Sequence, residues 1–425
     1  MNLTVKPRTG VQSEVMVPGD KSISHRSVML GAIARGQTRI KNFLPAADCL
    51  SSLSCMEQLG ARIDRVSATE MVINGQGLDS LSEPKDILNV GNSGTTIRLL
   101  TGLLAGQEFV SWLTGDESIR QRPMARVTDP LKEMGASIWG RQGGRYAPLA
   151  IKGSSLTGRH HTIPVASAQV KSALLLAGLY AGGETAVTEP AASRDHTERM
   201  LKGFGAEIRK DGLTSIIKPG ELKAATIVIP GDISSAAFYL AAGAIIPDAC
   251  ITIKGAGINP TRTGIIEVLT MMGARIQVTN ACEIAGEPIG DITVKTGELK
   301  GIEFGGEIIP RLVDEIPILA VVAALAEGQT IIRDAQELKV KESNRLQTTA
   351  QELRRFGVNI QETDDGLIIR GGRNYTGAVC ESHDDHRIAM ACTLMGLAAA
   401  GTTTIKNADC TDISFPGFAE AVANL

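Results

Sequence analysis

Six segments of the chain are apolar on almost every helical face, and each continues, through Gly or a substitute, into a short run that is β-branched in most copies. The copies are rich in Ala, Gly and Leu and cover residues 30–40, 100–110, 176–187, 240–253, 322–332 and 394–405. A segment that is apolar all round predicts a buried helix, and the β-branched run after it predicts a strand. Six copies of the pattern predict a fold built from internal repeats.

A second repeated block consists of Gly, then Ala or Val, any residue, and Ile. It begins at Gly60, Gly135, Gly205, Gly273 and Gly357. Gly tolerates positive φ at the end of a helix, so each block predicts a helix that stops and turns directly into a strand. Residues 46–60 and 261–273 have the amphipathic pattern of such helices. We expect each repeat to run strand, helix, strand, helix, strand.

The fold class expected from this pattern is α/β, with buried helices and outer sheets in an inside-out arrangement. A chain of 425 residues is too long for one ordinary core, so we expect two domains of three repeats each. Residues 20–230 would form one domain, and residues 1–19 together with 231–425 the other. The sixth repeat lacks a closing strand, which a strand within residues 2–8 could replace.

The chain would cross between these two domains twice. The tetrapeptides VPGD at 17–20 and IPGD at 229–232 share a Pro-Gly turn, and we interpret the pair as a double hinge. Two ordinary turns at strand ends are the alternative interpretation.

Every buried helix is preceded by a polar cluster. The clusters are DKSISHR (20–26), GNSGTTIR (91–98), ASAQVKS (166–172), GDISSA (231–236), DEIP (314–317) and HDDHR (383–387). Helix starts bind anions through unpaired N–H groups and the helix dipole, although capping alone would also explain Ser, Thr, Asp and Asn there. We favour capping for 231–236, which has no cation. In 20–26, Lys21 and Arg26 lie where the dipole disfavours cations, which favours a function.

Cations also gather in three segments outside the helix starts, at 118–126, 193–200 and 338–346. In the last, Lys341 and Arg345 are four residues apart and are predicted to share a helical face, with Glu342 beside them. For this segment alone, a solvated helix with salt bridges is the preferred interpretation.

Composition excludes several classes of protein. A net charge of -3 and 3% aromatic residues disfavour a nucleic-acid-binding protein. The seven scattered cysteines predict free buried thiols in a reducing compartment. No apolar stretch suits a signal peptide or a membrane span, so we expect a cytoplasmic protein. Adjacent residues at a helix start point in different directions, so HDDHR (383–387) is a poor metal motif and we expect no metal.

The motifs DKSISHR, GNSGTTIR, RPM, SAQVKSALLLAGL, DEIP, KESNRL and DDHR occur here in the order that is typical of 5-enolpyruvylshikimate-3-phosphate synthases. The chain resembles this family over essentially its whole length. The resemblance implies two inside-out α/β barrel domains around a cleft. It also implies transfer of the enolpyruvyl group of phosphoenolpyruvate to the 5-hydroxyl of shikimate 3-phosphate, in the shikimate pathway, with no metal or organic cofactor.

The resemblance also assigns site residues. Shikimate 3-phosphate would contact Lys21, Ser22, Arg26, Ser167, Ala168, Gln169, Arg194, Asp314 and Lys341. Phosphoenolpyruvate would contact Lys21, Gly94, Arg122, Gln169, Arg345 and Arg387. Asp314 is the candidate base for the hydroxyl, and Glu342 and Lys21 share the protonation of the methylene carbon. Neighbouring cations disfavour the protonated form of Glu342 and favour proton release from Lys21, so the residues alone leave that choice open.

Two departures from the family pattern indicate the branch often called class II. Asp412, Ile413 and Ser414 occupy a segment in which some members carry a Lys, and Leu99 follows Arg98 where other members have Pro. The herbicide glyphosate is an expected inhibitor because Gly94 leaves room for it, although the sequence does not decide sensitivity. We expect a monomer.

Two alternative functions compete with this interpretation. The related enolpyruvyl transferase that acts on UDP-N-acetylglucosamine usually has a Cys shortly before its Arg-Pro and an Asn after its Lys. This chain has DESIRQRP (116–123) and Ser22 at those places. A non-catalytic anion-binding protein with two domains is the second alternative, and the retained Asp314 and Glu342 disfavour it.

Overall fold

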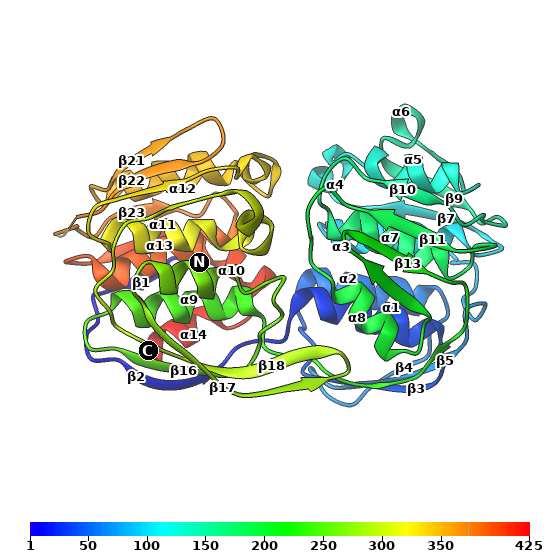
Figure 1. Ribbon diagram of the computed structural model, residues 1–425, viewed down its shortest axis with the longest axis horizontal. Helices are drawn as coiled ribbons and strands as arrows, with labels where there is room; N and C mark the ends of the chain where they lie inside the picture. The colour runs from blue at the N-terminus through cyan, green and yellow to red at the C-terminus, as the bar shows by residue number, and fades with distance from the viewer. Residues whose placement is uncertain (373) are drawn as a thin grey trace. The chain divides into compact units, whose positions relative to one another are not determined.

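The computed structural model describes residues 1–372 and 374–425, and the chain forms two compact units (Figure 1). Unit 1 comprises Met1–Pro18, Pro230–Cys282 and Pro288–Leu425, and unit 2 comprises Gly19–Ile229 and Glu283–Glu287. The short segment Glu283–Glu287 belongs to unit 2, although we expected it in the domain of residues 1–19 and 231–425. It lies at the turn of a hairpin between two long strands, where no Pro-Gly signal marks a change of unit.

Unit 2 contains three buried helices, five further helices and three sheets. The buried helices are α1 (Lys21–Ile33), α3 (Gly94–Ala105) and α7 (Ala168–Gly178), and the others are α2 (Ala47–Gln58), α4 (Glu117–Gln121), α5 (Ala125–Glu133), α6 (Arg141–Gly144) and α8 (His196–Gly203). The sheets have the strand orders β14-β3-β5-β4 with β15 also on β3, β6-β7-β9-β8, and β10-β11-β13-β12. Their strands are β3 (Ala34–Lys41), β4 (Ile63–Arg65), β5 (Met71–Gln76), β6 (Leu88–Asn89), β7 (Val110–Thr114), β8 (Ser137–Gly140), β9 (Tyr146–Lys152), β10 (His160–Thr162), β11 (Thr185–Thr188), β12 (Ile208–Asp211), β13 (Thr214–Ile217), β14 (Leu222–Lys223) and β15 (Thr226–Val228).

Unit 1 has the same kind of organisation, and its three buried helices pack against one another (Figure 1). These are α9 (Ile233–Ile245), α11 (Ile316–Leu325) and α13 (His386–Ala398), followed in their repeats by α10 (Gly264–Met271), α12 (Arg345–Arg355) and α14 (Phe418–Ala423). Short 3-10 helices are η1 (Gly306–Arg311), η2 (Val313–Glu315), η3 (Gln336–Val340) and η4 (Ala408–Ile413). The sheets are β17-β18-β16-β2, β19-β20-β22-β21 and β1-β24-β23. Their strands are β1 (Leu3–Val5), β2 (Gln12–Met16), β16 (Cys250–Gly257), β17 (Arg275–Ile284), β18 (Glu287–Lys295), β19 (Glu303–Phe304), β20 (Gln329–Ile332), β21 (Asn359–Glu362), β22 (Leu367–Arg370), β23 (Val379–Glu381) and β24 (Thr403–Lys406).

Most repeats end in two strands, where the sequence predicted one. In the repeat that contains α3, β6 pairs with β7 in parallel, and β7 and β8 both pair with β9 antiparallel. The strand that follows the Gly-Ala-x-Ile block is β8, which lies at the sheet edge, while β9 returns between β8 and β7. The prediction of five elements was wrong because the returning strand carries no repeated motif.

The strands next to the two Pro-Gly turns pair outside the unit of the helix that follows them. β2 precedes α1 of unit 2 but pairs in parallel with β16 of unit 1. β15 precedes α9 of unit 1 but pairs in parallel with β3 of unit 2. At the N-terminus, β1 pairs antiparallel with β24 from Leu3 opposite Ile405 to Val5 opposite Thr403, so this strand completes the sheet of the sixth repeat.

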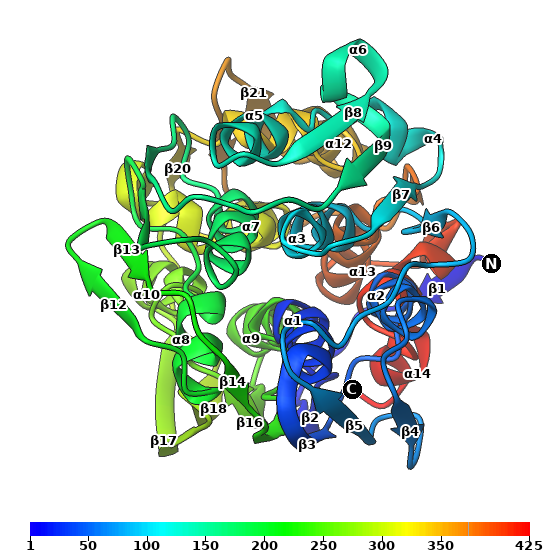
Figure 2. The ribbon, with the colours of Figure 1, turned by 90° about the vertical axis from the view of Figure 1, so that its right-hand side faces the viewer.

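Small residues allow the buried helices to approach each other closely. A Cβ atom at Gly102 of α3 would lie 2.1 Å from the carbonyl oxygen of Ala173 in α7, and the two helices lie side by side (Figure 2). Leu103 and Leu174 on these helices are fully buried, which contributes roughly 1.5–3 kcal/mol for each side chain. The Ala and Gly content of the six segments therefore reflects helix-to-helix distance.

The cysteines are free, but the prediction that all are buried was wrong. Cys282 is exposed, and Cys250 and Cys410 are partly exposed. Within the described residues, none of the helices combines the length and the apolar character needed to cross a membrane.

Candidate active site

The six polar clusters lie at the starts of the six buried helices, as predicted. Side chains cap five of these helices: Asp20 accepts from Ile23 N, Ser93 from Thr96 N, Ser167 from Val170 N, Asp232 from Ser234 N and Asp385 from Arg387 N. In α11 Pro317 occupies the first turn instead. Capping of α9 by Asp232 confirms the interpretation of residues 231–236 as a cap.

Arg26 is a buried cation of unit 2 that is held by uncharged groups. It is 5% exposed, and its guanidinium donates to Thr197 Oγ1 at 2.6 Å, Ser22 O at 2.9 Å and Ser172 Oγ at 2.7 Å. Burial lowers the pKa of Arg26 to about 10, against the charges of Glu198, Asp20 and Glu287, which act to raise it. The charge of Arg194 adds a smaller effect in the lowering direction. A buried cation whose hydrogen-bond acceptors are neutral favours binding of an anion.

Lys21 lies one turn before Arg26 and is oriented by a carboxylate. Its Nζ atom is 2.5 Å from Asp48 Oδ2, and both side chains are partly buried. Asp48 stands in the first turn of α2, so α2 positions the ammonium group. Asp48 was not among the predicted site residues, because nothing in the sequence relates a lone Asp in an amphipathic helix to a Lys of the preceding helix.

A second group of unit 2 gathers around the start of α3. A Cβ atom on Gly94 would lie 2.9 Å from Arg98 Nη1 and 3.3 Å from Arg122 Nη1, so both guanidinium groups reach the backbone there. Arg122 donates to Asn92 Oδ1 at 2.7 Å. Arg98 Nη1 donates to Gln169 Oε1 at 2.5 Å. The structure thus brings together Gly94, Arg122 and Gln169, and it adds Arg98, which the sequence showed only as part of a motif.

The remaining predicted residues of unit 2 lie near these two groups. Ser167 and Ala168 form the partly buried start of α7, beside Gln169. Arg194 is partly buried, and its charge acts to lower the pKa of Arg26.

In unit 1, Arg345 binds three carboxylates. It is 2% exposed, and its Nε, Nη1 and Nη2 atoms lie 2.9 Å from Asp385, 3.1 Å from Asp314 and 2.6 Å from Glu342. Burial alone would lower the pKa of Arg345, but the three carboxylates outweigh it and raise the pKa. Arg345 therefore fixes Asp314 and Glu342 relative to each other, at the starts of α11 and α12.

Asp385 anchors this group from the start of α13. Its carboxylate is fully buried and accepts from Arg345 Nε at 2.9 Å, Ser343 Oγ at 2.9 Å and Arg387 N at 2.9 Å. Burial would raise the pKa of Asp385, yet the charge and hydrogen bond of Arg345 lower it overall. Asp385 stays ionised and holds Arg345 in one orientation.

Lys341 does not share a helical face with Arg345, so that prediction was wrong. Lys341 follows η3 in an extended conformation, and α12 begins only at Arg345, where Asn344 accepts from Gln347 N. The Nζ atom of Lys341 is 3.0 Å from Glu337 Oε1. The cap at Asn344 interrupts what the spacing suggested was a continuous helix.

Arg387 is buried in the first turn of α13. Its Nη1 atom donates to Ser234 O at 2.9 Å, and its Nε atom has no hydrogen-bond acceptor among the described residues. Ser234 also links to Arg262, Nη2 to Oγ at 2.6 Å, and to the buried Glu315. No pattern in the chain pointed to Arg262, which lies in a loop before α10.

Among the described residues, one buried cluster combines potential metal ligands, namely Glu352, Cys380 and Cys392. Glu352 Oε2 already accepts from Glu381 N at 3.0 Å and lies 2.9 Å from Arg355 Nε, while Oε1 is 3.0 Å from His383. A hydrogen bond with Cys380 and burial raise the pKa of the Cys392 thiol. A carboxylate that already has three partners, beside a thiol whose pKa is raised, does not fit a metal ion.

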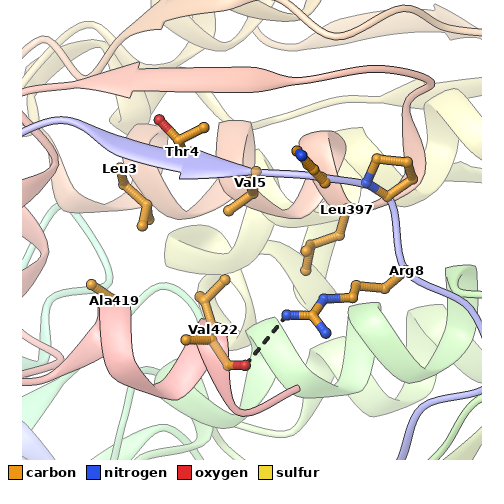
Figure 3. Close-up of a pocket in the computed structure, with 10 residues that line it drawn as sticks. Leu3, Thr4, Val5, Arg8, Leu397, Ala419 and Val422 are labelled. Atoms are coloured by element: carbon orange, nitrogen blue, oxygen red, sulfur yellow. Dashed lines mark hydrogen bonds between the residues drawn. The ribbon is translucent and has the colours of Figure 1, made fainter.

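A cavity of about 470 Å³ in unit 1 lies among β1, α13 and α14 (Figure 3). Its lining includes Val5, Leu397 and Val422, and Arg8 reaches Ala423 O at 3.3 Å at its edge. It contains none of the predicted site residues.

Comparisons with known proteins agree over the full chain. The family model described as EPSP synthase (3-phosphoshikimate 1-carboxyvinyltransferase) matches residues 5–422. A 3-phosphoshikimate 1-carboxyvinyltransferase of Desulforudis audaxviator is 54% identical over 426 residues, covering 100% of this chain and 99% of the relative. One of Geobacillus thermodenitrificans is 56% identical over 413 residues, covering 96% and 95%. The solved EPSP synthase of Acinetobacter baumannii is similar with a TM-score of 0.92 at 44% identity, covering 100% and 97%.

Proposed function

The chain belongs to the EPSP synthase family, and we propose on this premise that it transfers the enolpyruvyl group of phosphoenolpyruvate to the 5-hydroxyl of shikimate 3-phosphate. The products are 5-enolpyruvylshikimate 3-phosphate and phosphate. The reaction serves the shikimate pathway, which leads to the aromatic amino acids.

The observation that carries this proposal is the pair of carboxylates on Arg345. Addition of the hydroxyl to the carbon of phosphoenolpyruvate that carries the phosphate requires a base for the hydroxyl proton and an acid for the methylene carbon. Asp314 and Glu342, each within 3.1 Å of one guanidinium group, supply two proton-transfer groups at a fixed separation. Asp314 takes the hydroxyl proton, and Glu342 and Lys21 protonate the methylene carbon to give a tetrahedral intermediate. This intermediate then loses a proton from the new methyl group as it expels phosphate, which restores the double bond.

Two sets of residues bind the two substrates, and Lys21 and Gln169 belong to both. Shikimate 3-phosphate is bound by Arg26, Ser22, Ser167, Ala168, Gln169, Arg194, Lys21, Asp314 and Lys341. Phosphoenolpyruvate is bound by Gly94, Arg122, Arg387, Arg345, Lys21 and Gln169. The neutral acceptors around Arg26 support its role, because they leave its charge available to a phosphate. Arg345 acts mainly through the carboxylates that it already holds.

Other properties of the family complete the proposal. Each unit is an inside-out α/β barrel, and the segments 17–20 and 229–232 form a double hinge. The enzyme is a cytoplasmic monomer of the class II branch, needs no metal or organic cofactor, and binds glyphosate at the phosphoenolpyruvate site. The two guanidinium groups beside Gly94 support this last point, since they suit an anionic inhibitor.

A phosphate-release assay tests the function. Purified protein with phosphoenolpyruvate and shikimate 3-phosphate should release one phosphate per enolpyruvyl group transferred, with and without a chelator. UDP-N-acetylglucosamine as the acceptor should give no release. Release with the UDP-sugar alone would identify the related transferase, and ligand binding without any release would identify a binding protein. A chelator-sensitive rate would contradict the absence of a metal.

A further inference from the structure

Ser234, in the first turn of α9, uses all three of its polar groups at once. Its N–H donates to Asp232 Oδ1 at 2.8 Å, its hydroxyl donates to Glu315 Oε1, and its carbonyl oxygen accepts from Arg387 Nη1 at 2.9 Å. Because every one of these bonds is buried, a shift of Ser234 would move Arg387 or leave it without its acceptor.

Arg262 holds Ser234 from a different part of unit 1. It is 3% exposed, and its Nη2 atom lies 2.6 Å from Ser234 Oγ and 3.4 Å from Asp232 Oδ1. Glu315 is fully buried on the other side of the same hydroxyl. Buried charges are tolerated where opposite charges and hydrogen bonds compensate them. Arg262 supplies a positive charge beside Asp232, and the hydroxyl of Ser234 contacts both Arg262 and Glu315.

Arg387 has hydrogen-bonding capacity that the described part of the chain does not use. It is 7% exposed, and while Ser234 fixes Nη1, no acceptor in residues 1–372 and 374–425 reaches Nε. A buried N–H group without an acceptor is unfavourable unless a ligand provides one. The direction in which Nε points is set by the carbonyl group that holds Nη1.

We propose that Arg262 is a positioning residue for anion binding by Arg387. Arg262 holds the hydroxyl of Ser234, which also contacts Glu315, while Asp232 accepts from the Ser234 N–H. The carbonyl of Ser234 then orients the guanidinium of Arg387 towards its anion. The inference rests on the proposed function, in which Arg387 binds the phosphate or carboxylate of phosphoenolpyruvate. It gives the helix start of α9 a role in substrate binding beyond capping.

The kinetic test compares Arg262→Gln with the matched control Arg333→Gln, an exposed arginine of unit 1 paired with Glu303. Arg262→Gln should raise KM for phosphoenolpyruvate about tenfold while KM for shikimate 3-phosphate and kcat change less than about threefold. Arg262→Lys should recover part of the loss, and Arg333→Gln should match the parent protein. An equal rise in both KM values, or a lower Tm with unchanged kinetics, would show a purely structural role.

A binding test keeps this inference separate from the proposed function. Calorimetry with inorganic phosphate measures anion affinity without any turnover. Arg262→Gln and Arg387→Gln should each weaken phosphate binding, and the double variant should be no weaker than Arg387→Gln alone. Additive losses would overturn the inference even if the enzyme is active, whereas an inactive parent protein with the predicted non-additivity would overturn only the proposed function.

Two milder variants remain informative if Arg262→Gln does not fold. Arg262→Gln combined with Glu315→Gln removes one positive and one negative buried charge, so that the net charge around Ser234 is unchanged. Ser234→Ala removes only the hydroxyl that Arg262 contacts and leaves the carbonyl in place. Either variant should weaken phosphate binding in the same non-additive way with Arg387→Gln, and unchanged affinity in both would contradict the inference.

Discussion

Arg26 of unit 2 and Arg345 of unit 1 are both buried near helix starts, but their surroundings differ. The guanidinium of Arg26 donates to two hydroxyls and a carbonyl, whereas that of Arg345 lies against three carboxylates. Accordingly, burial lowers the pKa of Arg26 to about 10, while the carboxylates raise the pKa of Arg345 despite its burial.

The difference separates two uses of a buried cation. In the function proposed above, Arg26 keeps its positive charge available for an anion, because the acceptors of its hydrogen bonds are uncharged. Arg345 has its charge neutralised within unit 1 and serves to place carboxylates. Loss of Arg26 should therefore weaken binding, and loss of Arg345 should weaken both the fold and the reaction.

The largest effect is expected for Arg345→Gln. The substitution leaves the fully buried Asp385 without its cation, which should lower the free energy of unfolding by about 3–5 kcal/mol. Phosphate release should fall about a thousandfold or more, because Asp314 and Glu342 lose their common partner. Urea denaturation and the phosphate-release assay measure the two effects. Arg333→Gln, the exposed control, should lower the free energy of unfolding by less than about 1 kcal/mol. A similarly small loss for Arg345→Gln would contradict the contrast between Arg345 and Arg26.

Arg26→Gln should act on affinity rather than on stability. Loss of a charge-assisted contact should weaken binding of shikimate 3-phosphate by about 1.5–3 kcal/mol, or roughly 10- to 150-fold. The free energy of unfolding should change by less than about 1 kcal/mol, because no carboxylate accepts a hydrogen bond from Arg26 in the contacts above. Calorimetric titration measures the affinity, with the exposed Arg209→Gln as the control. A stability loss as large as that of Arg345→Gln would contradict this view.

Gly94→Ala should have a smaller effect that is confined to one substrate. The new methyl group would meet Arg98 Nη1 at 2.9 Å and Arg122 Nη1 at 3.3 Å, and these flexible side chains can move aside. KM for phosphoenolpyruvate and the inhibition constant of glyphosate should both rise about tenfold, with KM for shikimate 3-phosphate nearly unchanged. Steady-state kinetics with each substrate varied in turn measures this. A fall in kcat alone would place the two arginines outside the phosphoenolpyruvate site.

The smallest effect concerns pH and extends the comparison to buried histidines. Burial lowers the pKa of His25 in unit 2 and of His386 in unit 1 to about 3. Below about pH 6.5 the unfolded chain binds protons that the folded histidines do not, so stability falls as the pH drops from 6.5 towards 3. Each histidine should account for a loss of about 1 kcal/mol between pH 6.5 and 5.5. Between pH 6.5 and 5.5 the free energy of unfolding of His25→Gln, measured by urea denaturation, should therefore fall about 1 kcal/mol less than that of the parent protein. If the variant and the parent show the same pH dependence, the lowered pKa of His25 is refuted.

Much of the fold could be predicted because burial restricts which residue types a helix can contain. A helix that is surrounded on all sides must be apolar and, where a neighbouring backbone comes close, must contain Gly, as at Gly102. The returning strand of each repeat, such as β9, and the segment Glu283–Glu287 escaped prediction. Their pairing depends on partners distant in sequence, and neither carries a repeated motif.

The candidate site divides in the same way. The positions at helix starts could be predicted from the polar motifs, as for Lys21, Arg26, Gly94, Gln169, Asp314 and Arg387. Asp48, Arg98 and Arg262 acquire their roles only through contacts with other elements: Asp48 with Lys21, Arg98 with Gln169, and Arg262 with Ser234. Conversely, the spacing of Lys341 and Arg345 suggested a shared helical face, and the cap at Asn344 shows that spacing within the chain is not proximity on a helix.

The sequence by itself determined the repeats, the buried helices, the capped helix starts and the family, because these depend on local periodicity, capping chemistry and ordered motifs. The tertiary structure decided which charges meet. Arg26 and Arg345 are similar in sequence terms, each a cation beside a helix start, and only the folded chain places neutral oxygens around one and carboxylates around the other. Electrostatic energy falls off with distance in space, so the function of each arginine is set by neighbours that chain order does not reveal.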